Sequence, residues 1–209
     1  MKKILIVDDH QILRKGLKHI LTDEFGEVEF GEAANGIEAL QRIKEKKWDL
    51  VILDINMPGR NGLEVLKQVK DENINMFILV LSMHPEEQIA IRALKSGAAG
   101  YLAKDSADTE LINAIRQILS GRKYVPPSLA EQLACQLENP LDKAPHELLS
   151  DREYETLLLF AEGKTVSQIA QELSLSVPTI STFRARILDK MGMKTNAELV
   201  SYAIRNNLV

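Results

Sequence analysis

The side chains best suited to chemistry in this sequence directly follow short apolar runs. They are the carboxylates of Asp8, Asp9 and Asp54, the hydroxyl of Ser82 and the amine of Lys104. Three carboxylates held together repel one another unless a cation lies among them, and hard oxygen ligands favour Mg²⁺. A lysine and a hydroxyl on the far side of such an ion are the groups that a phosphoryl group requires. These residue types therefore indicate magnesium-assisted phosphoryl chemistry, on condition that the fold brings them together.

The apolar runs before these residues are predicted to be β-strands. They lie at 4–7, 50–53 and 77–81, with weaker ones at 28–33 and 100–103. Segments of helical periodicity separate them, which is typical of a doubly wound parallel sheet with the three wholly apolar strands at its centre. Ligands bind at the carboxyl ends of the strands in such a sheet, so all five candidate side chains should meet at one edge. Any one carboxylate could simply cap a helix, but capping does not explain five groups of complementary chemistry.

The size and charge of the chain set the class of protein. Its 209 residues fit one large domain or two small ones, and the net charge of -4 means that any nucleic-acid surface must be local. The single cysteine, Cys135, excludes a disulfide framework and a thiolate metal cluster. The opening apolar run of four residues is too short for a signal peptide or a membrane span. We expect a soluble cytoplasmic protein with no membrane association.

The pattern changes after Gly121. Residues 121–146 carry prolines near both ends and a short predicted helix opened by the capping box Ser128-x-x-Glu131, so we predict a linker there. Three further capping boxes precede apolar-periodic segments, at Ser150, Thr165 and Thr195. Together with the apolar periodicity they indicate four helices, at 151–162, 166–173, 177–191 and 196–206. The predicted architecture is a five-stranded α/β domain at 1–120, a linker at 121–146 and an all-α domain at 147–209.

The second and third of these four helices are separated by three residues, the spacing of a helix-turn-helix. The third helix has a predicted buried stripe at Ile180, Phe183, Ile187 and Met191. Its opposite side carries small or polar residues: Ser181, Thr182, Ala185, Arg186 and Asp189. The stretch 184–194 has a net charge of +3, whereas 146–209 as a whole has -1. The residues alone fit either a DNA-binding helix or the solvated face of a four-helix unit.

The segments VDDH, LDINMPGRNG, LSMH and GYLAK resemble the flavodoxin-like receiver domain of two-component response regulators. The resemblance implies that a histidine kinase phosphorylates Asp54. It implies that Mg²⁺ is held by Asp8, Asp9, Asp54 and the backbone carbonyl of Asn56. It implies switch and phosphate-binding roles for Ser82, Tyr101 and Lys104, and positions Asn56 and His84 resemble sites that tune dephosphorylation. Many receivers have a cis proline after the lysine, whereas here Asp105 follows, for which a cis bond costs about 2.5–4 kcal/mol.

Residues 149–204 resemble the LuxR-type DNA-binding domain, and its combination with a receiver is typical of the NarL/FixJ class of transcriptional regulators. The resemblance implies base contacts from Ser181, Thr182 and Ala185. It implies phosphate contacts from Lys164, Thr165, Thr179, Arg184, Arg186 and Lys190. It implies dimerisation through Leu199, Val200, Tyr202 and Ala203, each of which plain core packing explains equally well. The family commonly has lysine where Ser181 stands, so no base preference carries over.

The function expected from this resemblance is phosphorylation-dependent regulation of transcription by a protein that is not an enzyme. The expected partners are a sensor histidine kinase, double-stranded promoter DNA, RNA polymerase and a second copy of the phosphorylated chain. A hydrolase that forms an aspartyl-phosphate is disfavoured, because the position of its second carboxylate holds Asn56, which cannot serve as acid and base. A phosphorylation-controlled protein-interaction module remains the alternative, and a receiver that works without phosphate is a third reading.

The four histidines have no metal-ligand spacing and are expected on the surface or in helices: His10, His19, His84 and His146.

Overall fold

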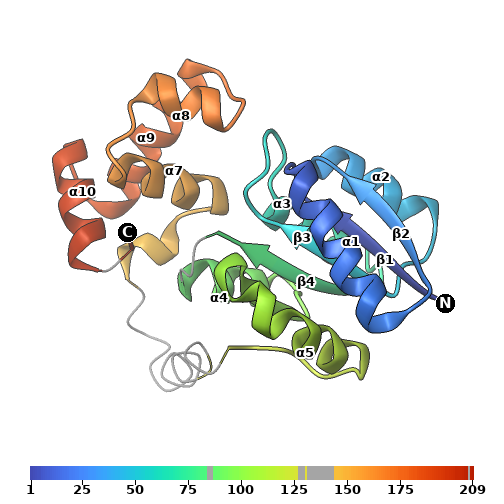
Figure 1. Ribbon diagram of the computed structural model, residues 1–209. Coiled ribbons are helices and arrows are strands. Elements are labelled where there is room, and N and C mark those ends of the chain that lie inside the picture. Colours follow the sequence, from blue (N-terminus) through green and yellow to red (C-terminus); the bar gives the residue numbers. More distant parts are fainter. Residues whose placement is uncertain (84–86, 127–129, 131–143, 207) are drawn as a thin grey trace. The chain divides into compact units, whose positions relative to one another are not determined.

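The structure, a computed structural model, describes residues 1–83, 87–126, 130, 144–206 and 208–209. The chain forms two compact units, Met1–Ala134 and Cys135–Val209, each with its own secondary structure (Figure 1). The predicted linker helix with its capping box Ser128-x-x-Glu131 lies outside the described residues, as does His84.

The first unit contains a five-stranded parallel sheet in the order β2-β1-β3-β4-β5 (Figure 1). The strands are β1 (Lys2–Val7), β2 (Val28–Ala33), β3 (Leu50–Asp54), β4 (Phe77–Ser82) and β5 (Gly100–Ala103). All five predicted strands are confirmed, and the three apolar ones are central. Every residue of β3 is buried, which explains why its sequence is a continuous apolar run rather than an alternating one.

Helices follow each strand of this unit. They are α1 (Gln11–Phe25), α2 (Gly36–Glu45), α3 (Gly62–Asp71), α4 (Glu87–Lys95) and α5 (Ala107–Leu119), with a short 3-10 helix, η1 (Lys104–Ser106), before α5. Helices α1 and α5 contribute Leu17, Leu21, Leu111 and Ile115 to one core cluster. The same cluster includes the alternate strand residues Ile4, Ile6, Ile52, Leu79 and Leu81. Packing on alternate residues fixes the register of the strands.

The second unit is all-α. Its elements are a 3-10 helix, η2 (Pro145–Leu148), and the helices α7 (Asp151–Ala161), α8 (Val166–Glu172), α9 (Val177–Met191) and α10 (Asn196–Arg205). The capping boxes at Ser150, Thr165 and Thr195 are all formed, so three of the four predicted helices begin where these motifs place them. The fourth, α9, begins after the N-cap residue Ser176. At the other end of α9, Gly192 has φ of 66°, the left-handed conformation that favours glycine after a helix. Within the described ranges, no helix has the length and apolar character needed to cross a bilayer.

Candidate functional site

The carboxyl ends of the strands bring the predicted reactive side chains to one edge of the sheet. Val7 of β1 is in register with Leu53 of β3, so Asp8 and Asp54 follow on adjacent strands. Ser82 ends β4 in register with Ala103 of β5, and Lys104 comes directly after. The expected convergence of residues nearly a hundred positions apart is therefore present in the structure.

Lys104 joins two of the carboxylates at this edge. Its Nζ donates hydrogen bonds to Asp8 Oδ2 and Asp54 Oδ2, each at 2.7 Å. The Lys104 side chain is 7% exposed and the Asp54 side chain 1%. Burial opposes the charge of the amine, but the two carboxylates outweigh burial and raise the pKa of Lys104 above its usual range. This lysine is thus a fixed cation that compensates two buried anions.

Asp54 is the least exposed of the three carboxylates of the site. Burial raises the pKa of its carboxyl to about 6, against the lowering effect of the Lys104 charge and hydrogen bond. The backbone N–H of Asn56 also donates to Asp54 Oδ1, at 3.1 Å. A buried carboxylate gains most from any further cation placed beside it, because water compensates its charge poorly.

Oxygen atoms suited to a divalent cation gather at the same place. One ligand atom from each of Asp8, Asp9, His10 and Asp54 lies within 4.8 Å of the others. The three carboxylates provide the hard oxygen donors that Mg²⁺ binds while retaining several waters. The residues present therefore fit a Mg²⁺ site.

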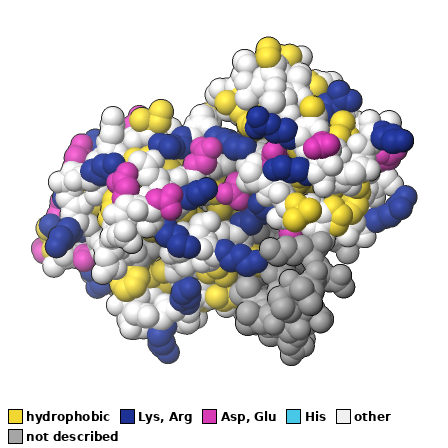
Figure 2. Space-filling model, turned by 180° about the vertical axis from the view of Figure 1, so that it is seen from behind, with side chains coloured by type: hydrophobic (Ala, Val, Ile, Leu, Met, Phe, Trp, Pro, Cys, Tyr) yellow, Lys and Arg dark blue, Asp and Glu magenta, His cyan; other side chains and the backbone are white. Residues whose placement is uncertain are grey.

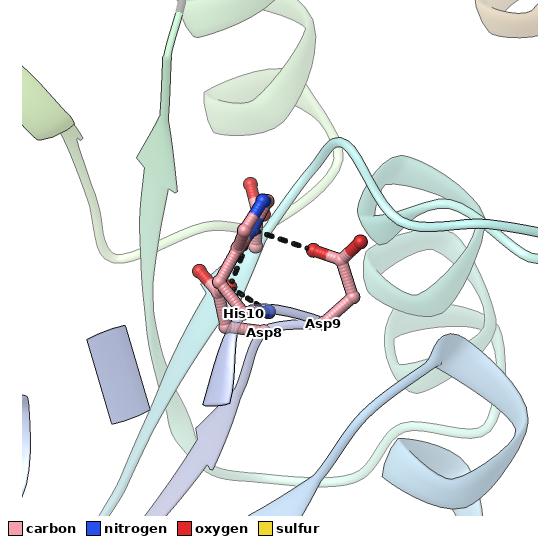
Figure 3. Close-up of side chains that lie close together, drawn as sticks. Asp8, Asp9 and His10 are labelled. Carbon is pink, nitrogen blue, oxygen red and sulfur yellow. Dashed lines mark hydrogen bonds and ion pairs between the residues drawn. The ribbon is translucent and has the colours of Figure 1, made fainter. Parts of the chain in front are cut away.

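His10 is a member of this cluster that the sequence did not single out. Its Nδ1 lies 2.9 Å from Asp9 Oδ1 and 3.3 Å from Asp8 Oδ1, as the dashed lines in Figure 3 show. The side chain is 69% exposed, so the expected surface location is correct but incomplete. Its position directly after the acidic pair was the available signal. His19 is exposed on α1, whereas His146 is buried in η2 and its Nδ1 is 2.8 Å from the hydroxyl of Tyr202.

The other two residues with predicted switch roles, Ser82 and Tyr101, are both buried. Ser82 is 0% exposed and Tyr101, within β5, is 3% exposed. The Lys104–Asp105 peptide bond is trans, in line with the energetic cost of a cis bond before a residue other than proline.

Gly62 determines how closely the chain packs behind Asp54. A Cβ atom at this position would lie 2.3 Å from the carbonyl oxygen of Asp54, and the Gly62 N–H donates to Ile55 O at 3.0 Å. Asn61 caps α3 through a hydrogen bond from the Glu64 N–H. The first turn of α3 thus rests directly on the end of β3, and only glycine fits at the contact.

In the second unit, α9 has the expected two faces. Ile180, Ile187 and Met191 are buried and Phe183 packs against the same core. The predicted outward residues are exposed: Ser181, Thr182, Ala185, Arg186 and Asp189. The hydroxyls of Ser181 and Thr182 each donate at 3.0 Å to carbonyl oxygens one turn earlier, so both are short, polar and already oriented along the helix.

Several cations near α9 have partners within the unit. Lys164 lies 2.8 Å from Glu162 and 2.7 Å from Glu172. Lys190 Nζ donates to Glu153 Oε2 at 2.6 Å, and Arg184 Nε donates to Asn196 Oδ1 at 2.6 Å. By contrast, Arg186 makes no hydrogen bond or ion pair with any residue that the structure describes.

The two threonines predicted to contact phosphate stand at helix starts. Thr165 caps α8, and Thr179 lies in the first turn of α9, where its hydroxyl is 2.7 Å from Ser176 Oγ. Helix N-termini present free N–H groups and favour anions. On the face drawn in Figure 2, Lys and Arg side chains are interspersed with Asp and Glu.

The four residues expected at a dimer surface on α10 divide into two pairs. Leu199 and Ala203 are 0% exposed and belong to the core of the unit. Val200 and Tyr202 are half-buried and Ile204 is exposed. Plain core packing accounts for Leu199 and Ala203 within one copy of the chain.

Comparison with known proteins finds two family models on the chain. The family described as "Response regulator receiver domain" matches residues 4–116, and the family described as "Bacterial regulatory proteins, luxR family" matches residues 147–203.

Similar proteins extend over the full chain. Response regulator UvrY of Escherichia coli K12 is 34% identical over 209 residues, which is 100% of this chain and 96% of UvrY. Response regulator GacA of Pseudomonas aeruginosa is 34% identical over 210 residues, which is 100% of this chain and 98% of GacA. A solved structure of RcsB from Salmonella enterica serovar Typhimurium, bound to promoter rprA in the presence of phosphomimetic BeF3-, has a TM-score of 0.65 and 27% identity. It covers 97% of this chain and 98% of that chain.

Proposed function

The chain belongs to the NarL/FixJ class of two-component response regulators, and we propose that phosphorylation of its Asp54 controls its binding to promoter DNA. As a member of this class it is a DNA-binding regulator of transcription. The observation that carries the assignment of Asp54 is its burial at a strand end, where Lys104 bridges it to Asp8. The cluster that includes Asp9 lies within reach of the same carboxylate.

The proposed modification is a transfer between two nucleophiles. A carboxylate oxygen of Asp54 attacks the phosphorus of a phosphohistidine on a sensor kinase, so an O–P bond forms and an N–P bond breaks. Mg²⁺, held by Asp8, Asp9, Asp54 and the carbonyl of Asn56, would neutralise charge on the phosphoryl oxygens. The chain needs no general base for this step, because the carboxylate is already deprotonated. It is therefore the recipient of a kinase's phosphoryl group, and we propose no separate enzymatic activity.

The phosphoryl group offers new acceptors to two residues of the site. Lys104, which holds Asp54 through one carboxylate oxygen, can move its hydrogen bond to a phosphoryl oxygen. The Ser82 hydroxyl stands at the same edge and can donate a second one, with Tyr101 repacking beside it. A change from 1% to 99% active needs about 5.5 kcal/mol, and one hydrogen bond to a charged group supplies about 1.5–3 kcal/mol. The free energy of activation must therefore come from several sources together: Lys104, Ser82, Mg²⁺ and dimerisation.

Promoter DNA is the proposed ligand of the second unit. We assign base contacts to Ser181, Thr182 and Ala185 on the exposed face of α9. We assign phosphate contacts to Lys164, Thr165, Thr179, Arg184, Arg186 and Lys190. RcsB has been solved on promoter DNA and as dimers on DNA, which supports a homodimer here, with Val200 and Tyr202 as the accessible members of the dimer surface on α10. Promoter binding also places RNA polymerase among the expected partners and the protein in the cytoplasm.

The DNA proposal is tested by the salt dependence of duplex binding. Duplexes selected by the phosphodonor-treated chain are titrated with wild type, Arg186→Ala and Arg205→Ala, which removes the same charge from α10. We expect the magnitude of the slope of log affinity against log salt to fall by about one per subunit, and hence by about two per homodimer, for Arg186→Ala. It should stay unchanged for Arg205→Ala. Equal slopes for all three proteins would show that Arg186 makes no phosphate contact, which would contradict the proposed role of α9 in DNA binding. Failure to select any duplex would favour the alternative, a module that binds a protein.

A further inference from the structure

Arg14 on α1 connects the reactive edge to two other elements. Its Nη1 donates to the main-chain carbonyl oxygen of Asp8 at 2.6 Å. Its Nε donates to Glu32 Oε2, on β2, at 2.8 Å. The Arg14 side chain is only 12% exposed, whereas that of Glu32 is 37% exposed, so the guanidinium is largely buried and its carboxylate partner lies at the surface.

The carbonyl that Arg14 contacts lies just beyond the end of the sheet. The ladder of β1 ends at Val7, and the last backbone bond on that side runs from the Asp8 N–H to Ala33 O at 3.2 Å. From Asp8 the chain turns into α1 within three residues. A carbonyl at such a point has no ladder partner, and a charge-assisted bond from a guanidinium fixes its direction.

The direction of the Asp8 backbone decides where its carboxylate lies. In the structure Asp8 Oδ2 accepts from Lys104, and Asp8 Oδ1 accepts from the His10 N–H at 2.8 Å. A rotation of the peptide after Asp8 would shift the turn that leads to His10, whose N–H holds Asp8 Oδ1. By fixing the carbonyl of Asp8, Arg14 therefore also helps to fix the Asp8 carboxylate, which is a proposed metal ligand.

Glu32 keeps the guanidinium in place. Hydrogen bonds from Lys18 and Arg14 lower the pKa of Glu32, so it stays a carboxylate. The planar guanidinium can hold a carbonyl and a carboxylate at once from two of its nitrogens, which a lysine amine on a flexible stem does less well.

We infer that Arg14 is a positioning residue of the phosphoacceptor site, which orients Asp8 for Mg²⁺ by holding its main-chain carbonyl, with Glu32 as its support. The inference rests on the proposed function and adds a residue to which that function assigns no role. It differs from a purely structural tie between α1 and β2, because such a tie would serve equally well through Lys18, which binds the same carboxylate.

Lys18 therefore provides the matched control. It shares Glu32 with Arg14, and among the described residues its only hydrogen bond is to that carboxylate. The full chain is made as wild type, Arg14→Ala, Arg14→Lys, Glu32→Gln and Lys18→Ala. The dissociation constant for Mg²⁺, without phosphodonor, is measured by calorimetry at a temperature well below the thermal unfolding midpoint of each variant. Phosphoryl uptake from a small phosphodonor is then measured at saturating Mg²⁺.

We expect Arg14→Ala to weaken Mg²⁺ binding about tenfold, the size of effect usual for residues that orient metal ligands. Lys18→Ala should leave the Mg²⁺ dissociation constant within about twofold of that of wild type. The constants of Arg14→Lys and Glu32→Gln should lie between those of Lys18→Ala and Arg14→Ala. Saturating Mg²⁺ should restore most of the phosphoryl uptake of Arg14→Ala.

Three results would overturn the inference: an unchanged constant in Arg14→Ala, an equal loss in Lys18→Ala, or, if Arg14→Ala does not fold, an unchanged constant in Glu32→Gln. Failure of the proposed function is distinguishable, because wild type itself would then bind no Mg²⁺ and take up no phosphoryl group.

Discussion

At the scale of single residues, the site is a balance between buried carboxylates and one buried amine. Asp8 and Asp54 are almost wholly inaccessible, and Lys104 meets both. Neither the pair of anions nor the cation would be stable there alone. A divalent cation at this site could compensate the same carboxylates as the amine does. Two predictions test this compensation.

The first concerns Lys104→Ala. Removal of the amine leaves two buried carboxylates uncompensated, so the free energy of unfolding without metal should fall by about 3 kcal/mol. Added Mg²⁺ should recover part of this loss, because the ion can take the place of the amine. The measurement is chemical denaturation with EDTA or with Mg²⁺. Lys44→Ala, which removes an exposed ion pair with Glu72, should cost at most about 1 kcal/mol under both conditions. An equal loss for Lys104→Ala with and without Mg²⁺ would contradict the exchange.

The second concerns pH. The pKa of Asp54 is raised from 3.8 to about 6 by burial, so the folded state favours the neutral carboxyl. This contribution to stability is complete below about pH 4 and is lost as the pH rises through 6, a change of about 3 kcal/mol in metal-free protein. The free energy of unfolding of wild type, relative to the non-titrating Asp54→Asn, should decline over this interval in EDTA. With Mg²⁺ the decline should be much smaller, since the ion stabilises the charged form. A flat difference in EDTA would show that Asp54 is not in this environment.

At the scale of elements, several cations around α9 that we propose as DNA contacts also have partners within the fold. Lys190 is held by Glu153, a buried residue of α7 that also accepts from the Ser150 N–H at 2.8 Å. Burial alone would raise the pKa of Glu153, but the bonds from Lys190 and Ser150 together lower it. Arg186 has no such partner in the described structure, so it can meet a phosphate without breaking an ion pair.

This arrangement makes Glu153→Gln informative. Glutamine preserves the capping box at Ser150 but releases Lys190 from its ion pair. We expect the salt dependence of duplex binding to steepen by about one unit per subunit, with stability reduced by about 1 kcal/mol. Glu155→Gln removes the same charge from α7 at a residue that pairs with Arg152, and its salt dependence should match wild type. Unchanged binding by Glu153→Gln would mean that Lys190 does not reach the DNA.

Elements and strand ends were predictable from the sequence because their signals are local. The apolar run before Asp54 and the capping box at Ser150 each specify an element within a few residues. The contacts of Arg14 with Asp8 and of Lys190 with Glu153 were not predictable, because they depend on how separate elements pack. Leu199 and Ala203 show the same limit, since a periodic apolar pattern does not distinguish a core from a dimer surface. Gly62 ends the quoted motif LDINMPGRNG, but its role was not predictable, because a glycine does not indicate which backbone lies against it.

At the scale of the whole molecule, the two units carry separate chemistry on one chain. The first has a carboxylate that can gain a phosphoryl group, and the second has a helix that can enter a groove of DNA. Coupling between them requires that phosphorylation change the affinity for DNA, and by linkage that DNA favour the phosphorylated form. Hence Asp54→Ala should bind selected duplexes as weakly as unphosphorylated wild type, and a phosphodonor should leave its affinity unchanged. Binding as tight as that of the phosphorylated wild type would disprove the coupling.

The central claim is that Asp54 is the phosphoacceptor, and the most direct test is the intact mass of the chain after incubation with a small phosphodonor. Wild type and Asp54→Ala are compared with Mg²⁺ and with EDTA. We predict a single phosphoryl adduct on wild type with Mg²⁺, and none on the mutant or in EDTA. An adduct on Asp54→Ala equal to that on wild type, or no adduct on wild type with any phosphodonor, would contradict the account.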